Sequence, residues 1–238
     1  MPADTAHGVE LYQQGNYKEA IKLLKKASKK DKRDAVAWQF LGLALQQQGD
    51  QKGAQKALEQ AVELRFAQLA DAYSFNKKFA ELTKAERAVM RAEQAQRDRA
   101  ALAAVESYLK LSPKDAVFWR EQADSLQFYI KLAEAPESEP LAYSASELSQ
   151  GTRAIIFSKP EPTFTEKARR KGTTGAVMVR CVLGADGRVQ HILVTKPLPN
   201  GLSERAVDAT RQIQFKPAMK DGHAVSQFVT VAYNFNIY

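Results

Sequence analysis

The side chains able to do chemistry in this chain of 238 residues are few and scattered. Its three histidines, His7, His191 and His223, lie in unrelated segments, and there is one cysteine, Cys181. This spacing matches no metal-binding pattern, because zinc sites draw their ligands from short, regular intervals. No Gly-rich phosphate loop and no Ser-centred nucleophile elbow occurs. The sequence therefore predicts no enzyme, no catalytic residue, no metal and no cofactor, and its function is expected to lie in binding.

The isolated residues have plain structural interpretations. Cys181 is expected to be a small buried core residue, and His191, on a predicted strand, a surface or structural residue. The net charge is +8, with most of the excess in residues 153–238. Such a surface suits acidic partners, anionic lipid or nucleic acid, but a solvated basic surface is the favoured interpretation. Nucleic-acid binding is not expected, because the aromatic residues are used in predicted helix and sheet cores.

The composition is that of a folded, water-soluble chain, with 45% hydrophobic and 26% charged residues. No apolar run approaches the roughly 18 residues needed to span a membrane. The first residues, MPADTAHGVELYQQG, lack the basic and apolar regions of a signal peptide. Two readings remain open: a cytosolic chain, or a chain that lacks its targeting segment.

The elements in the first half repeat with a period of 34 residues. Small residues in equivalent places allow two antiparallel helices to approach closely, and large ones fill the space beside them. Gly15 and Gly49 supply the turn between the helices of each pair. The matched positions are Gly8 and Gly42, Leu11 and Leu45, Gly15 and Gly49, Ala20 and Ala54, Leu24 and Leu58, and Ala27 and Ala61.

This pattern resembles the tetratricopeptide (TPR) repeat in residues 1–34 and 35–68. A long helix follows from the Thr83–Glu86 capping-box pattern to Leu111, and residues 116–134 are expected to form a closing helix. The resemblance implies a superhelix with a concave groove for peptides or helices. Some TPRs bind a terminal carboxylate with Lys and Asn in the groove, but the predicted groove positions of this chain hold neither. The alternative interpretation is that these positions are plain helix surface. The predicted groove positions are Thr5, Val9, Tyr12, Gln39, Leu43 and Gln46.

Residues 135–152, APESEPLAYSASELSQGT, read as an inter-domain linker because they are rich in Pro, Ser and acidic residues. Three apolar residues in it, Leu141, Tyr143 and Leu148, are expected to dock on a neighbouring domain. The predicted organisation is a helical repeat domain at 1–134, this linker, and a second domain at 153–238.

The pattern in the last third changes to the alternation of strands. Residues 176–183 have an apolar core face, and a tight turn at Asp186-Gly187 leads to a return strand at 189–195. Ser203 is the predicted N-cap of a helix at 204–214. Pro217 and a second turn at Asp221-Gly222 then lead to a terminal strand whose odd positions are apolar except for Gln227. The order β-β-α-β predicts a small antiparallel sheet with one face covered by a helix.

These pieces together resemble the C-terminal domain of the TonB family, the energy transducers of Gram-negative bacteria. The resemblance rests on KPEPTFTEKARRKGTTGAVMV, ADGRV, FKPAMKDGHAV and the terminal strand, in this order. One departure is Thr165, where the family commonly has proline. The fold class is thus predicted as two-domain α+β, with an all-α TPR-like superhelix followed by a TonB C-terminal-like domain.

The TonB resemblance implies a periplasmic domain that binds an extended segment of an outer-membrane receptor by adding a strand to its sheet. A free strand edge offers backbone N–H and C=O groups to such a peptide. We therefore expect a protein-binding envelope adaptor, with a role in energy-dependent outer-membrane transport. The predicted binding positions on the terminal strand are Ser226, Phe228, Thr230, Ala232, Asn234 and Asn236.

Alternatives to strand addition remain open at this point. The terminal strand would otherwise only close the sheet, or would pair with a second copy to form a homodimer. In that case the chain is a structural scaffold or a cell-wall-docking protein without a receptor.

Overall fold

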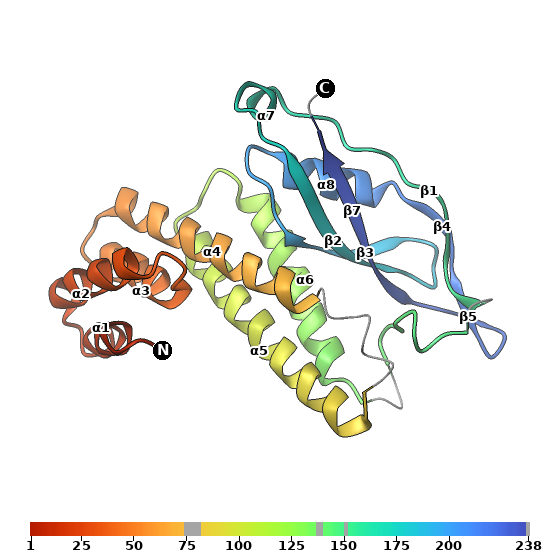
Figure 1. Ribbon diagram of the computed structural model, residues 1–238, viewed down its shortest axis with the longest axis horizontal. Coiled ribbons are helices and arrows are strands. Elements are labelled where there is room, and N and C mark those ends of the chain that lie inside the picture. Colours follow the sequence, from red (N-terminus) through yellow and green to blue (C-terminus); the bar gives the residue numbers. More distant parts are fainter. Residues whose placement is uncertain (74–81, 137–139, 150–151, 237–238) are drawn as a thin grey trace. The chain divides into compact units, whose positions relative to one another are not determined.

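The computed structural model describes residues 1–238 except 74–81, 137–139, 150–151 and 237–238 (Figure 1). The chain forms two compact units, of which the first comprises residues 1–68 and 100–123 and the second residues 69–99 and 124–238. Three long helices, α4 (Gln51–Tyr73), α5 (Lys84–Leu109) and α6 (Ala116–Glu134), contribute residues to both units. The boundaries predicted at residues 134 and 153 mark where the sequence pattern changes, and they stay a prediction about independent folding.

The first unit is built from antiparallel helix pairs, beginning with α1 (Ala3–Gln13), α2 (Tyr17–Lys30) and α3 (Ala35–Gln47). The predicted pairing of small and large residues is present. A Cβ atom placed on Gly42 would lie 2.5 Å from the Cγ atom of Leu58, and one on Gly8 would lie 2.7 Å from Leu24. The two glycines therefore set how closely each pair of helices can pack.

We expect the substitution Gly42→Ala to destabilise the protein by about 1–3 kcal/mol, because the added methyl group overpacks the contact with Leu58. Urea unfolding followed by circular dichroism measures this. Gln47→Ala, at an exposed position of the same helix, is the control and should change stability by less than about 0.5 kcal/mol. Equal effects of the two substitutions would contradict this account of the helix contact.

The second unit contains a three-stranded antiparallel sheet in the order β3-β2-β7. The strands are β2 (Gly175–Leu183), β3 (Val189–Lys196) and β7 (Gln227–Phe235). Helix α8 (Leu202–Arg211) packs on one face (Figure 1). The hydroxyl of its Thr210 lies 3.3 Å from that of Tyr233. The predicted fold class, with helical repeats followed by a small antiparallel domain, is confirmed.

Helix α8 begins two residues earlier than predicted. Its N-cap is Gly201, whose φ of 84° suits glycine, and Ser203 lies inside the first turn. The Ser203 hydroxyl instead donates to the carbonyl of Leu198 and accepts from its N–H, at 2.9 and 3.0 Å. The prediction of Ser203 as the N-cap was therefore wrong, because this hydroxyl holds the loop that enters the helix.

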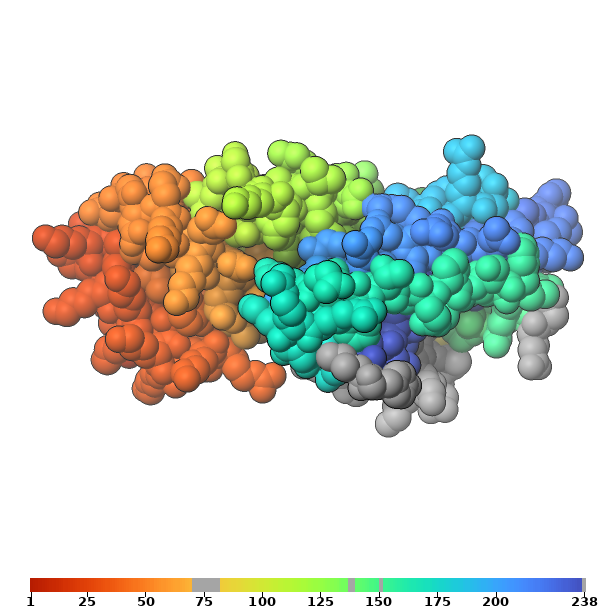
Figure 2. Space-filling view, turned by 90° about the horizontal axis from the view of Figure 1, so that it is seen from above, coloured from red at the N-terminus to blue at the C-terminus, as the bar shows by residue number. Residues whose placement is uncertain are grey.

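Short elements missed by the sequence analysis complete this unit. β1 (Ile155–Ser158) pairs with β4 (Gln214–Lys216), and β5 (Ala218–Lys220) forms a hairpin with β6 (His223–Val225). Helix α7 (Glu166–Arg170) is capped by Thr165, whose side chain accepts from the N–H of Ala168. The family's usual proline could not form this cap, so the departure at Thr165 has a local role. Figure 2 shows the segment from β1 to α7 on the surface, beside the residues of α8 to β6.

The second face of the sheet is covered by the last turns of α6. The hydroxyl of Ser125 donates to the carbonyl of Ile192, and that of Tyr129 to the carbonyl of His191, both at 3.0 Å. The rings of Phe128 and His191 stack with centroids 3.6 Å apart. The sheet is thus the middle layer between two helices, where the sequence analysis had assigned only one.

Candidate functional site

Strand β7 is an edge strand of the sheet. It pairs with β2 without a register shift along its whole length. Tyr143 shows which backbone groups point outward, because it accepts from the N–H of Phe228 and donates to the carbonyl of Ser226 on the side away from β2. Since these groups alternate sides along a strand, the even-numbered residues of β7 direct their N–H and C=O groups outward.

Four of the six predicted binding positions are exposed to solvent, and a fifth is partly buried. The side chains of Thr230, Ala232, Asn234 and Asn236 are exposed, with Asn236 just beyond the end of β7. Ser226 lies just before β7, and its hydroxyl accepts from the N–H of Ala185 at 3.2 Å. Ser226 therefore supports the neighbouring turn.

The sixth position, Phe228, is half-buried, and its ring covers the guanidinium of Arg180 at 4.4 Å. The start of the edge is already occupied by the linker, since the N–H of Phe228 donates to Tyr143 at 3.0 Å. Linker residue Leu148 is buried, as expected, whereas Leu141 is 48% exposed and does not dock.

Two further polar side chains make hydrogen bonds at β7. The ammonium of Lys159 donates to the outward carbonyl of Ala232 at 3.1 Å and lies 4.7 Å from the ring centre of Tyr233. Gln227, which interrupts the apolar face of the strand, is buried and accepts from the N–H of Ala154 at 2.8 Å. Within the described part of the chain, the outward backbone groups of Thr230 and Asn234 have no hydrogen-bond partner.

The predicted TPR positions lie at different depths in the first unit. Thr5 is buried and donates to the carboxylate of Asp34 at 2.6 Å, and Gln39 is also buried. Val9, Tyr12, Leu43 and Gln46 are half-buried. Tyr12 packs edge-on against Phe40, with ring centres 5.4 Å apart. A groove on these helices would therefore be lined by the four half-buried residues, and it stays a prediction.

The titratable residues singled out in the sequence are not brought together. Burial raises the pKa of the Cys181 thiol to about 12, so the thiol is protonated and inert in the core. His7 lies 3.5 Å from Glu10, and His223 is exposed on β6. Among the residues that the structure describes, no group of three or more His, Cys, Asp or Glu side chains could hold a metal ion.

His191 is held in a packing role. It has a φ of 48°, at the irregularity where β2 and β3 shift register, and its ring stacks on Phe128. Burial lowers the pKa of His191 below its ordinary value of 6.5. The unfolded chain therefore takes up this proton first as the pH falls. The stability contributed by neutral His191 is complete above pH 6.5 and is lost as the pH falls through that value toward the folded pKa.

We expect the free energy of unfolding to fall between pH 7.5 and pH 5.5, and His191→Asn to show a smaller fall than the wild type. Asparagine tolerates the positive φ and does not titrate. Urea unfolding at the two pH values measures the difference. His223→Asn is the matched control and should keep the wild-type fall, whereas an unchanged fall in His191→Asn would contradict the role of His191.

Comparison with known proteins assigns both parts of the chain. Residues 160–237 match the family described as the Gram-negative bacterial TonB protein C-terminal. Residues 8–49 match a TPR repeat family, and residues 35–68 match the tetratricopeptide repeat. The predicted TonB C-terminal-like domain and TPR repeats are thus confirmed.

Two similar proteins show how much of the chain the TonB similarity covers. Protein TonB of Vibrio cholerae serotype O1 is 27% identical over 105 residues, which cover 42% of this chain and 43% of that protein. The match therefore spans less than half of the relative. The solution structure of the Pseudomonas aeruginosa TonB C-terminal domain is 24% identical, with a TM-score of 0.32, over 40% of this chain and 93% of that one. No described helix is both long and apolar enough to cross a membrane.

Proposed function

We propose that this chain is an adaptor of the cell envelope, acting in the periplasm. Its TonB-like domain binds an extended segment of a partner protein by adding a strand to β7, and its TPR helices recruit a second protein. The observation that carries the proposal is the edge of β7, where Thr230 and Asn234 have outward backbone groups without a hydrogen-bond partner among the described residues.

The chemistry of the edge supports strand addition by backbone recognition. Exposed Thr230 and Asn234, together with the capping ammonium of Lys159, keep the unoccupied edge soluble. An incoming strand would gain hydrogen bonds to the outward groups and would displace Lys159 from the carbonyl of Ala232. Tyr143 already forms the same kind of bond with Ser226 and Phe228, which supports the ability of this edge to accept a further strand.

The partner segment would belong to an outer-membrane receptor, and the process served would be energy-dependent transport. This part of the proposal draws on the TonB family match of residues 160–237. Protein partners are also what TPR repeats imply.

The test is a calorimetric titration of the purified protein with peptides from the plug-proximal ends of the outer-membrane receptors of the same organism. We expect at least one peptide to bind at high micromolar concentration or below, and its scrambled version not to bind. If no receptor peptide binds and sedimentation shows a dimer that Thr230→Pro dissociates, the chain is a scaffold that pairs through β7.

A further inference from the structure

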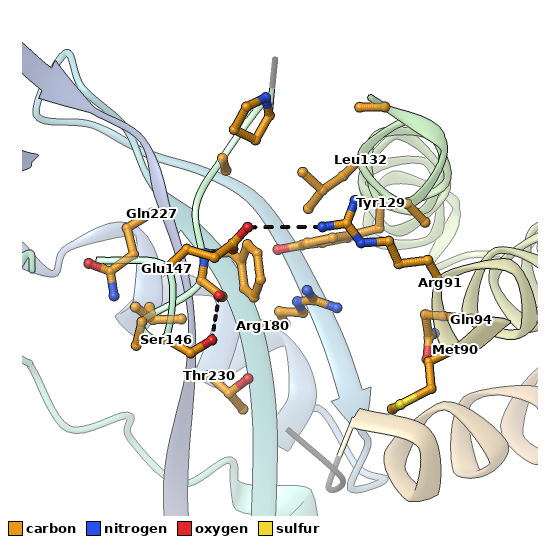
Figure 3. Close-up of a pocket in the computed structure, with 18 of the residues that line it drawn as sticks. Met90, Arg91, Gln94, Tyr129, Leu132, Ser146, Glu147, Arg180, Gln227 and Thr230 are labelled. Atoms are coloured by element: carbon orange, nitrogen blue, oxygen red, sulfur yellow. Dashed lines mark hydrogen bonds and ion pairs between the residues drawn. The ribbon is translucent and has the colours of Figure 1, made fainter. Parts of the chain in front are cut away.

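A pocket of about 800 Å³ lies wholly within the second unit (Figure 3). Its walls are the first half of α5, the last turns of α6, the linker around residues 140–147, and the face of β2 and β7 that α8 does not cover. This volume is within the range of about 300–1,000 Å³ found for small-molecule sites. Phe228 and Thr230, two of the predicted strand-binding positions, also line it, but an added strand uses backbone groups at the edge and needs no such cavity.

The charge in the pocket is mainly positive. Arg91, Arg153 and Arg180 line it, and among the described lining residues the one carboxylate is that of Glu147, 3.9 Å from the guanidinium of Arg91. Arg153 is exposed at the rim. The described lining residues therefore carry an excess of two positive charges, which favours an anionic ligand.

Arg180 is the innermost of these charges, with only 8% of its surface exposed. Its guanidinium lies between two aromatic rings, 4.6 Å from the centre of Tyr129 and 4.4 Å from that of Phe228. These contacts fix the orientation of the guanidinium on the pocket wall. Arginine presents a planar fork of donors, so this guanidinium is suited to bind the two oxygens of a carboxylate.

Much of the remaining lining is apolar and has room for a hydrocarbon body, and the uncharged polar residues in it are Gln94, Ser144, Ser146, Gln227 and Thr230. Side chains without polar donors or acceptors come from both helices, the linker and the sheet: Met90, Leu132, Ala133, Ala142, Met178 and Val229. In Figure 3, Arg180 lies between these walls and Arg91 reaches toward Glu147 from α5. A cationic wall beside an apolar one matches a molecule with a negative head and an apolar tail.

We propose that this pocket binds a small amphipathic anion, with its carboxylate at Arg180 and Arg153 and its apolar body against the walls from α5 and α6. The carboxylate of Glu147 offsets part of the positive charge of the three arginines, so Glu147 lowers the affinity of the pocket for the ligand. The proposal does not require strand addition to β7, although the pocket and the edge share Phe228 and Thr230.

The test uses decanoate as the probe in calorimetric titrations of the full chain below its micelle concentration. Decanoate should bind, whereas acetate, which lacks the tail, and decyltrimethylammonium, which has the opposite charge, should not. Arg180→Gln is expected to weaken decanoate binding about tenfold, the effect of losing one charge-assisted hydrogen bond. Arg153→Gln should weaken it about threefold, and Glu147→Gln should tighten it about threefold.

Matched controls keep the result interpretable. Arg188→Gln and Glu166→Gln change exposed charges outside the pocket lining and should bind like the wild type. If Arg180→Gln does not fold, the opposite shifts of Arg153→Gln and Glu147→Gln decide, because both residues lie at or near the surface. The proposal is overturned if decanoate does not bind at millimolar concentration, if decyltrimethylammonium binds equally well, or if the pocket variants bind like the controls.

Discussion

Thr230→Pro is expected to weaken binding of a receptor peptide at least about tenfold while the protein stays folded. The N–H of Thr230 points away from β2, so proline removes no hydrogen bond of the existing sheet. Proline is tolerated at such edge positions for this reason. In the variant, however, β7 offers one N–H donor fewer to an added strand, and the proline ring obstructs that strand. The lost hydrogen bond together with the steric conflict should weaken the free energy of binding by about 1.4 kcal/mol or more.

The matched control for this prediction is Thr230→Ala, which removes the side chain but keeps the N–H. It should bind the peptide within about threefold of the wild type, because strand addition uses the backbone. Circular dichroism and thermal melting of both variants exclude loss of folding. Equal binding by Thr230→Pro and the wild type would place the peptide elsewhere on the protein.

Tyr129→Ala is expected to destabilise the protein by about 3–5 kcal/mol, the usual cost of removing a large buried aromatic side chain. Tyr129 is only 2% exposed, and its ring lies under the guanidinium of Arg180. The substitution also leaves the carbonyl of His191 without the hydroxyl that donates to it. Urea unfolding followed by circular dichroism measures the change.

Tyr129→Phe separates the ring from its hydroxyl. It should cost only about 1 kcal/mol, since the ring remains and a single hydrogen bond is lost. If Tyr129→Ala also costs less than about 1 kcal/mol, the last turns of α6 do not pack in the core of the sheet domain. The pocket between α6 and the sheet would then not exist as described.

Regular repeats and long alternating strands were predictable because their signals are local. The pairing of Gly42 with Leu58 follows from the period of the repeats, and the hairpin at Asp186-Gly187 follows from turn chemistry. Strands of three or four residues, such as β4 and β5, are too short to show a period. They form because distant residues pair with them.

The candidate site depends on contacts that the sequence does not reveal. Gln227 looked like an interruption of an apolar face, but it satisfies the N–H of Ala154, 73 residues away along the chain. One feature of the sequence could have predicted that α6 covers the second face of the sheet: Met178 and Val182 make the other face of β2 apolar as well. Arg180 between them is a residue type typical of a solvent-exposed position, and its contacts with the rings of Tyr129 and Phe228, which the sequence does not reveal, help to bury it.

The most direct test of strand addition is amide hydrogen exchange along β7, measured by nuclear magnetic resonance with and without a bound receptor peptide. The amides of Thr230 and Asn234 should exchange fast in the free protein and become protected in the complex. Those of Val229, Val231 and Tyr233, which face β2, should be protected in both states. A complex that forms while the amides of Thr230 and Asn234 remain unprotected would contradict the account.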